Sequence, residues 1–199
     1  MRDWEQCYQD GRTPWDRGDA APPLLETIAR HGVDLWGAGT VLVPGCGLGH
    51  DVRALAAAGL PVVGLDLAPT AVAKARELPA AAGEAYEVGD FLDPAWREAR
   101  RYTAIWEHTC FCAIDPALRP RYAEAAAGLL DSGHVLVGVF YLEPTKPGEE
   151  EHEGPPFGAT VAELDETFGP WFERIDGWVP ELAYDGREGR EWVGIYRRR

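Results

Sequence analysis

A glycine-rich turn between an apolar run and a helical run carries the strongest chemical signal in the sequence. Residues 41–44 (VLVP) are apolar, Gly45, Gly47 and Gly49 follow at every second position, and residues 50–58 have a helical pattern. Glycines permit positive φ angles and let a ligand lie against bare backbone, while the free N–H groups at the start of a helix attract a negative group. The pattern predicts a strand, a ligand-binding loop and a helix that hold a small anion such as a carboxylate.

The spacing of these glycines separates two kinds of nucleotide cofactor. A dinucleotide fingerprint has the spacing G-x-G-x-x-G, and its third position falls here on His50. A bound pyrophosphate requires close approach of the helix at that position, so a histidine fits poorly. The observed G-x-G-x-G spacing is that of S-adenosylmethionine-dependent methyltransferases. We therefore disfavour a nicotinamide-dependent oxidoreductase.

Two aspartates follow later strands of the same expected sheet. Asp66 ends the apolar run VVGLD, at roughly the 20-residue separation from the glycine loop that a βαβ unit gives, and it can accept hydrogen bonds from both ribose hydroxyls. Asp90 follows the next run and can accept from an adenine amino group, while Phe91 covers the ring. Each aspartate alone could equally be a helix cap. In this order, at one edge of one sheet, they predict a cofactor site.

The elements that must position these residues alternate along the chain. Apolar runs at 40–44, 62–66, 85–88, 102–106 and 135–141 alternate with helical patterns at 50–58, 69–78 and 116–130. Strands that are apolar on both faces, alternating with helices, indicate a mostly parallel sheet covered on each side. Two further runs, 172–179 and 191–197, flank a polar stretch at 185–189 and predict an antiparallel hairpin. We expect an α/β, Rossmann-like fold with a seven-stranded, mostly parallel sheet, in a single domain over residues 1–199.

The composition excludes several classes of partner. A formal net charge of −14 opposes nucleic acids, which bind basic surfaces. No apolar run reaches the roughly 18 residues of a transmembrane helix, and the N-terminus lacks a secretory pattern. Cys110 and Cys112 form a C-x-C pair without the second pair that a zinc site needs, so we expect buried thiols and no metal. We expect a cytoplasmic protein, monomeric or weakly homo-oligomeric, with a small-molecule substrate.

With these residues in view, the sequence resembles the thiopurine S-methyltransferase family, and within it the thiol and halide methyltransferases. The resemblance spans nearly the whole chain and rests on Trp4…Tyr8-Gln9-Asp10-Gly11…Thr13-Pro14-Trp15-Asp16, on residues 43–51 (VPGCGLGHD) and 63–66 (VGLD), on Phe111-Cys112-Ala113-Ile114, on Leu118-Arg119, and on Gly154-Pro155-Pro156-Phe157. It implies a class I methyltransferase fold, S-adenosyl-L-methionine as cofactor and S-adenosyl-L-homocysteine as product. It also implies a small acceptor, such as a thiol, hydrosulfide, halide or thiopurine-like sulfur.

The resemblance implies roles for segments outside the sheet as well. Residues 1–39 would form a lid over the cofactor, and residues 143–158 a flap over the substrate, within which Glu149–Glu151 and His152 are expected to be solvated. The cofactor-binding residues, from the motifs and the resemblance together, are Trp4, Tyr8, Gly11, Thr13, Trp15, Gly45, Cys46, Gly47, Gly49, Asp51, Asp66, Leu67, Asp90, Phe91, Glu107 and His108. Those facing the substrate are Trp15, Phe111, Tyr141 and Phe157. Aromatic faces favour a sulfonium cation, although the N-terminal aromatics could equally only pack a helix onto the sheet.

The sequence departs from the family where the acceptor is expected. Thiol and halide methyltransferases tend to carry Asp-Tyr-Thr-Phe-Phe-Cys-Ala, whereas residues 107–113 are EHTCFCA, with His108 in the tyrosine position and Cys110 in a phenylalanine position. His108 either takes the proton of a thiol acceptor, because histidine titrates near neutrality, or contacts the cofactor without moving a proton. A carboxylate, amine or metalloid acceptor, or a non-catalytic cofactor-binding module, remain the alternative functions.

Overall fold

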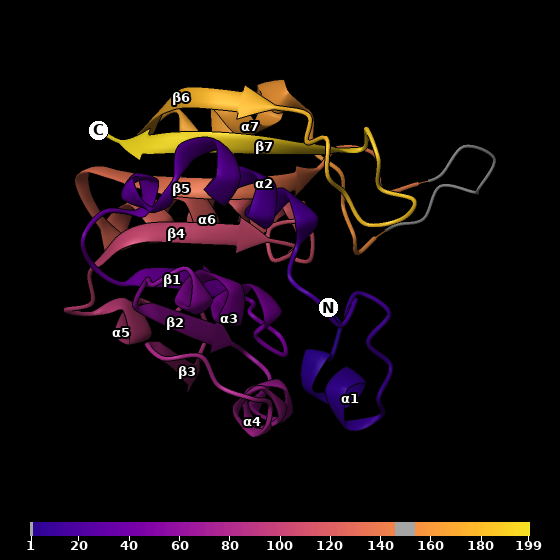
Figure 1. Cartoon of the computed structure of the whole chain (residues 1–199). Helices are drawn as coiled ribbons and strands as arrows, with labels where there is room; N and C mark the ends of the chain where they lie inside the picture. Colours follow the sequence, from indigo (N-terminus) through magenta and orange to yellow (C-terminus); the bar gives the residue numbers. More distant parts are fainter. Residues whose placement is uncertain (1, 146–153) are drawn as a thin grey trace.

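A seven-stranded sheet forms the centre of the computed structural model, which describes residues 2–145 and 154–199 (Figure 1). The strands are β1 (Val41–Pro44), β2 (Val62–Asp66), β3 (Glu84–Val88), β4 (Tyr102–His108), β5 (Leu130–Tyr141), β6 (Phe172–Trp178) and β7 (Glu191–Arg198). Their spatial order is β3-β2-β1-β4-β5-β7-β6, and β7 is antiparallel to both of its neighbours. The expected α/β fold, a mostly parallel sheet that ends in an antiparallel hairpin, is confirmed.

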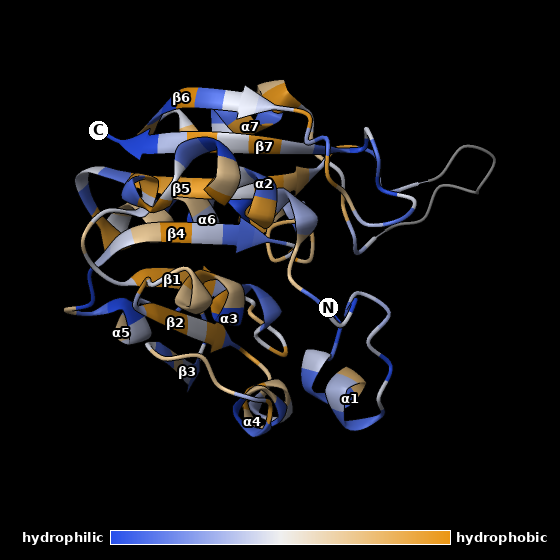
Figure 2. Cartoon of the chain, viewed as in Figure 1, coloured by the Kyte–Doolittle hydropathy of each residue, from blue (hydrophilic) through white to orange (hydrophobic). Residues whose placement is uncertain are grey.

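Helices cover both faces of the sheet. They are α1 (Trp4–Gln9), α2 (Pro22–His31), α3 (His50–Ala57), α4 (Pro69–Glu77), α5 (Pro94–Arg97), α6 (Arg119–Leu129) and α7 (Val161–Phe168), with 3-10 turns at Val33–Trp36 and Pro116–Leu118. Side chains alternate across each strand, so Leu42 joins the core under α6 and α7 while Val41 and Val43 join the core under α2 and α3. Figure 2 shows the apolar residues gathered on the central strands. Within the described residues, no helix combines the length and apolar character that a membrane span requires.

The structure adds three helices that the sequence pattern did not predict, namely α2, α5 and α7. Helix α7 begins with a capping box, in which the Thr160 hydroxyl and the Glu163 carboxylate satisfy each other's backbone N–H groups. Strand β5 also starts earlier than expected, at Leu130, which pairs with Tyr102 of β4. The polar residues 131–134 resemble a turn in the sequence, yet they extend the strand at the sheet's amino end.

Candidate active site

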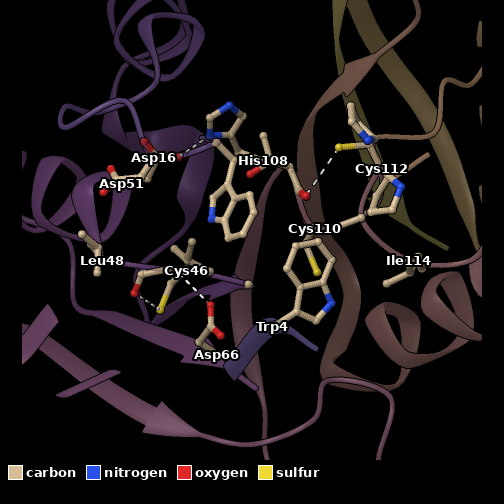
Figure 3. A pocket seen from close by; sticks show the side chains of 18 of the residues that line it. Trp4, Asp16, Cys46, Leu48, Asp51, Asp66, His108, Cys110, Cys112 and Ile114 are labelled. Carbon is tan, nitrogen blue, oxygen red and sulfur yellow. Dashed lines mark hydrogen bonds and ion pairs between the residues drawn. The ribbon is translucent and has the colours of Figure 1, made fainter. Parts of the chain in front are cut away.

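A cavity of about 520 Å³ opens at the carboxyl ends of β1 to β4 (Figure 3). The strand ends and the loops that follow them supply residues 45–48, 65–67, 89–92 and 108–110. The N-terminal segment supplies Arg2, Trp4, Tyr8, residues 14–17 and Asp19. Much of the remaining wall consists of residues 112–114, Tyr122, Tyr141, Pro155, Pro156 and residues 184–187. In Figure 3, Leu48 and Asp51 lie across the cavity from Cys112 and Ile114. Ligands of open α/β sheets bind at this edge.

The glycine loop has the backbone that its sequence predicts. Gly45, Gly47 and Gly49 have φ angles of +62°, +53° and +76°, a region that side-chain-bearing residues avoid. A Cβ atom on Gly45 would lie 2.9 Å from Cβ of Cys110, and one on Gly47 would lie 2.7 Å from the Tyr8 hydroxyl. The loop therefore requires glycine for its conformation and for the close approach of its neighbours.

Asp66 joins the end of β2 to the glycine loop. One carboxylate oxygen accepts from the amide of Gly47 at 2.8 Å, and the other accepts from the amide of Ala68 at 2.9 Å. Burial raises the pKa of Asp66, although these amide hydrogen bonds act in the opposite direction. A carboxylate has about four acceptor positions, so Asp66 can accept further hydrogen bonds from a ligand in the cavity.

Asp90 and Phe91 lie at the next strand end, as the sequence predicts. The Asp90 carboxylate accepts from the amide of Leu92 at 2.8 Å, which fixes the turn after β3. Phe91 is buried, and its ring lies 4.7 Å from that of Tyr122. Both residues line the cavity. The edge thus presents the glycine loop, two carboxylates and an aromatic ring in order. These groups fit the amino acid, ribose and adenine parts of S-adenosylmethionine.

Three aromatic rings of the N-terminal segment cluster over this edge. Trp15 donates through Nε1 to the Tyr8 hydroxyl at 3.1 Å, and its ring meets that of Trp4 edge-on at 5.2 Å. The guanidinium of Arg2 lies 5.4 Å from the Trp4 ring and 5.9 Å from the Trp15 ring. These rings therefore already accept a cation, which is the property that shielding a sulfonium requires.

The N-terminal segment is fastened to the body at several points. Glu5 accepts from the amide and the hydroxyl of Thr70 on α4, and Lys74 donates to the carbonyl of Tyr8 at 2.7 Å. Asp16 and His50 are 3.1 Å apart. By contrast, α2 and the turn that ends at Trp36 pack into the core. The part of the expected lid 1–39 that borders the cavity is therefore shorter and ends near Asp19.

Asp51 and His108 form a buried pair in the cavity wall. An oxygen of Asp51 lies 3.0 Å from Nδ1 of His108 and accepts from Nε1 of Trp106 at 2.8 Å. The other oxygen accepts from the amide of Ala21 at 2.7 Å. Burial opposes ionisation of Asp51, but the charge and hydrogen bond of His108, with the remaining donors, outweigh it and lower the pKa of this carboxyl.

The structure brings thirteen of the predicted site residues to the cavity wall and leaves six away from it. Those lining it are Trp4, Tyr8, Trp15, Gly45, Cys46, Gly47, Asp51, Asp66, Leu67, Asp90, Phe91, His108 and Tyr141, and those away from it are Gly11, Thr13, Gly49, Glu107, Phe111 and Phe157. Phe111 packs in the core, 5.4 Å from the ring of Phe140. Phe157 donates its amide to the carbonyl of Cys112. Glu149–Glu151 and His152 lie outside the described residues.

Glu107 lies beneath the cavity instead of in its wall. Its carboxylate accepts from the amide of Phe111 at 2.7 Å and from the hydroxyl of Tyr122, which does line the cavity. Burial raises the pKa of Glu107 to about 7, against the opposing effect of these hydrogen bonds. Glu107 therefore ties the turn after β4 to α6.

We expect the Glu107→Gln variant to lose one component of the pH dependence of stability. A carboxyl with a raised folded-state pKa stabilises the fold fully below its unfolded value, and this contribution is lost as pH rises through about 7. In the wild type the loss is on the order of 2–3 kcal/mol. Urea unfolding of both proteins from pH 4.5 to 8 measures it. A constant difference in unfolding free energy across that range would contradict the assignment.

Three cysteines line the cavity: Cys46, Cys110 and Cys112. Burial raises the pKa of all three thiols, to about 12 for Cys112, and the negative charge of Asp66 or Glu107 adds to the effect. The thiolate is the nucleophilic form of cysteine. These side chains therefore stay protonated, and all four cysteines of the chain are free thiols.

Several residues in or next to the site were not predicted from the sequence. They include Arg2, Asp16, Thr70, Lys74, Tyr122, Tyr184 and Arg187. Arg187 belongs to the polar stretch 185–189, which the sequence marks only as the turn of the hairpin, and Tyr184 directly precedes that stretch. Nothing in the local pattern of α4 indicates that Thr70 and Lys74 hold the N-terminal segment, because these contacts span more than 60 positions in the chain.

The fold and the site define a class I S-adenosylmethionine-dependent methyltransferase. The family model described as thiopurine S-methyltransferase matches residues 1–177. The chain belongs to the thiopurine S-methyltransferase family.

Relatives with known names match most or nearly all of the chain. It is 34% identical to a protein named probable thiol methyltransferase 2 of Arabidopsis thaliana, over 98% of this chain and 84% of the relative. It is 33% identical to thiocyanate methyltransferase 1 of Brassica oleracea, again over 98% and 84%. It is 30% identical to a thiopurine S-methyltransferase of Xanthomonas campestris, over 83% of this chain and 80% of the relative.

Solved structures share the fold. A methyltransferase from Anabaena variabilis, described as SAM-dependent, superposes with a TM-score of 0.74 at 18% identity, covering 98% of this chain and 93% of its own. A Burkholderia thailandensis 1,6-didemethyltoxoflavin-N1-methyltransferase, solved with S-adenosylhomocysteine, superposes with a TM-score of 0.71 at 18% identity, covering 98% and 85%. At such identities the likeness concerns the fold alone.

Proposed function

We propose that this methyltransferase transfers the methyl group of S-adenosylmethionine to a small sulfur nucleophile or halide: a thiol, hydrosulfide, thiocyanate, thiopurine-like sulfur or iodide. The observation that carries the proposal is the match to proteins named thiol and thiocyanate methyltransferases over 98% of the chain. The cavity of about 520 Å³ supports it, because that space must hold both cofactor and acceptor.

We assign the cofactor to the carboxyl edge of the sheet. The backbone of the glycine loop and the start of α3 would receive its carboxylate, Asp66 its ribose hydroxyls and Asp90 its adenine amino group. Phe91 would cover the adenine ring, and the rings of the N-terminal segment would shield its sulfonium. The hydrogen bonds that hold Asp66 and Asp90 in place support these roles.

When bound, the cofactor supplies an electrophilic methyl group on a positively charged sulfur. The chain's own residues hold the acceptor in line with that group and keep water out, which can contribute up to roughly 7–11 kcal/mol to the rate. Charge disappears when an anion meets a sulfonium, so the partly apolar lining of the cavity favours the reaction. The raised pKa values of Cys46, Cys110 and Cys112 keep these thiols from competing with the acceptor for the methyl group.

A tritiated-methyl assay across thiols, hydrosulfide, iodide, thiocyanate and thiopurines tests the proposal. We expect turnover with at least one sulfur acceptor, and calorimetry should show that S-adenosylhomocysteine binds more tightly than NAD. Methylation confined to carboxylates, amines or metalloids would replace the proposed acceptor class. Cofactor binding without any S-adenosylhomocysteine production would instead favour a non-catalytic binding module.

We further propose that the enzyme works in the cytoplasm as a monomer or weak homo-oligomer on small molecules, not on nucleic acid. The free state of all four cysteines fits a reducing compartment. The net charge of −14 opposes a polyphosphate partner. Light scattering measures the mass in solution, and a stable tetramer would contradict the proposed state.

A further inference from the structure

We propose that Asp51 and His108 form a base dyad that removes the proton of a thiol acceptor as its sulfur is methylated. The inference rests on the proposed function, because it concerns the acceptor side of the same cavity. It divides the acceptors into two groups: protonated thiols, which need the dyad, and anions such as thiocyanate and iodide, which have no proton to lose.

The orientation of the imidazole carries the proposal. An oxygen of Asp51 lies 3.0 Å from Nδ1 of His108, and the side chains of both residues are only 12% exposed. The carboxylate cannot rotate freely, since it also accepts from Trp106 and from the amide of Ala21. A carboxylate accepts and does not donate, so Nδ1 carries the hydrogen, and whenever the ring is neutral Nε2 keeps its lone pair.

The second ring nitrogen supplies an independent observation. Nε2 of His108 is buried and has no hydrogen-bond partner within the described residues. A buried acceptor without a partner costs free energy, and native structures retain such groups where a ligand or a catalytic step uses them. His108 lines the cavity. The S–H group of an acceptor is a donor that would satisfy this nitrogen.

The surroundings hold the histidine in place. The ring of Tyr184 stacks on it at 6.1 Å, and the Tyr184 hydroxyl donates to the carbonyl of Asp19 at 2.7 Å. Thr109, the next residue, has a φ of +65°, a conformation that is strained for a β-branched side chain and that persists mainly at functional sites. The titratable and charged groups nearest this pair are Asp19 from the N-terminal segment and Tyr184 with Arg187 from the β6–β7 connection. Glu107 points under the cavity and acts on His108 only through its charge.

The chemistry balances without a further reactant. A typical thiol has a pKa near 8.5, so most of it is protonated at neutral pH, and the thiolate is the nucleophile. The thiol proton passes to Nε2 of His108 while the thiol sulfur forms a bond to the transferred methyl carbon. The bond between that carbon and the donor sulfur breaks, and its electron pair stays on the donor sulfur. His108 then returns its proton to water.

The dyad is tested by comparing two acceptors in the same variants, His108→Gln and Asp51→Asn. At saturating cofactor, turnover of 2-mercaptoethanol should fall by at least about 100-fold, the lower range for general base catalysis. Turnover of thiocyanate reports any loss that arises through cofactor binding, so the ratio of thiol turnover to thiocyanate turnover should fall by that factor in each variant. Thiol turnover by His108→Gln should recover as pH rises, because thiolate then forms in solution. His31→Gln is the matched control. His31 also pairs with an aspartate, Asp176, at 3.4 Å, but neither residue lines the cavity.

A measurement on the wild type without cofactor avoids any folding defect of the variants. Long-range proton–nitrogen spectra of histidine-labelled protein identify which ring nitrogen carries the hydrogen, and His108→Gln assigns the signal. We expect the Nδ1–H form at neutral pH. The Nε2–H form, an equal loss with both acceptors, or an unchanged thiol rate would each overturn the dyad. Failure of the wild type to methylate any acceptor would instead overturn the proposed function.

Discussion

Replacing Asp66 with alanine should weaken the binding of S-adenosylhomocysteine by about 1.5–3 kcal/mol, the range for hydrogen bonds to a charged group. This corresponds to roughly a 10- to 150-fold higher Kd. We expect the upper part of the range, because the carboxylate also accepts from the amide of Gly47 and so organises the glycine loop. The maximal rate at saturating cofactor should change less than the affinity. Isothermal calorimetry and initial-rate kinetics provide the two readouts.

The pH dependence of binding gives a second test of Asp66. Burial raises the pKa of this carboxyl in the free protein, and ribose hydroxyls donate to its ionised form. The affinity for S-adenosylhomocysteine should therefore decline as the pH is lowered. The decline should begin at a higher pH than it would if Asp66 had the ordinary pKa of an aspartate. The Asp66→Ala variant should lack this decline.

Asp93→Ala serves as the control for Asp66→Ala. Asp93 is exposed, lies outside the cavity and accepts from the amide of Ala95 at 2.9 Å as a helix cap. If both variants lose stability alike and neither loses affinity, Asp66 is a cap and not a cofactor ligand.

The sequence was sufficient for the centre of the fold, for a physical reason. Buried parallel strands are apolar on both faces and are bounded by turns, so β1, β2, β4 and β5 stand out, and the glycine loop allows few other conformations. The sequence pattern did not predict elements that bury only one face or that contain mostly polar residues. Helix α2 buries only Pro23, Leu24 and Thr27, and the exposed start of β5 contains Gly133, which favours a turn in any local interpretation.

The site was predictable where a residue's position in a strand sets its place, as for Asp66 and Asp90. The site was not predictable where the direction of a side chain determines whether the residue lines the cavity. Glu107 and His108 are neighbours at the end of β4, and alternation sends them to opposite faces. His108 lines the cavity, whereas Glu107 points under it toward Tyr122. The pairing of His108 with Asp51 joins residues from two elements, and only the folded sheet brings them together.

Deleting residues 1–16 should abolish methyl transfer, with a loss of at least about 100-fold, the cost of even a 1 Å misplacement of reacting groups. The deletion removes Trp4, Tyr8 and Trp15 from the cavity wall. The sheet should still fold, because both large cores are built without this segment. Circular dichroism and urea unfolding measure the fold, and the methyl-transfer assay measures the loss. Trp15→Ala should likewise reduce turnover more than stability.

The same segment should respond to ligand. Helix α1 has six residues, too few to be stable alone, so its order depends on contacts such as that between Glu5 and Thr70. S-adenosylhomocysteine should protect the amides of residues 4–16 from hydrogen exchange while leaving those of α2 unchanged, as expected for a lid. Thr70→Val should speed exchange in α1, whereas Glu77→Gln, at the exposed end of α4, should not. Equal exchange with and without ligand, or full activity after the deletion, would contradict the lid. The aromatic residues would then serve only to pack the N-terminal segment against the sheet.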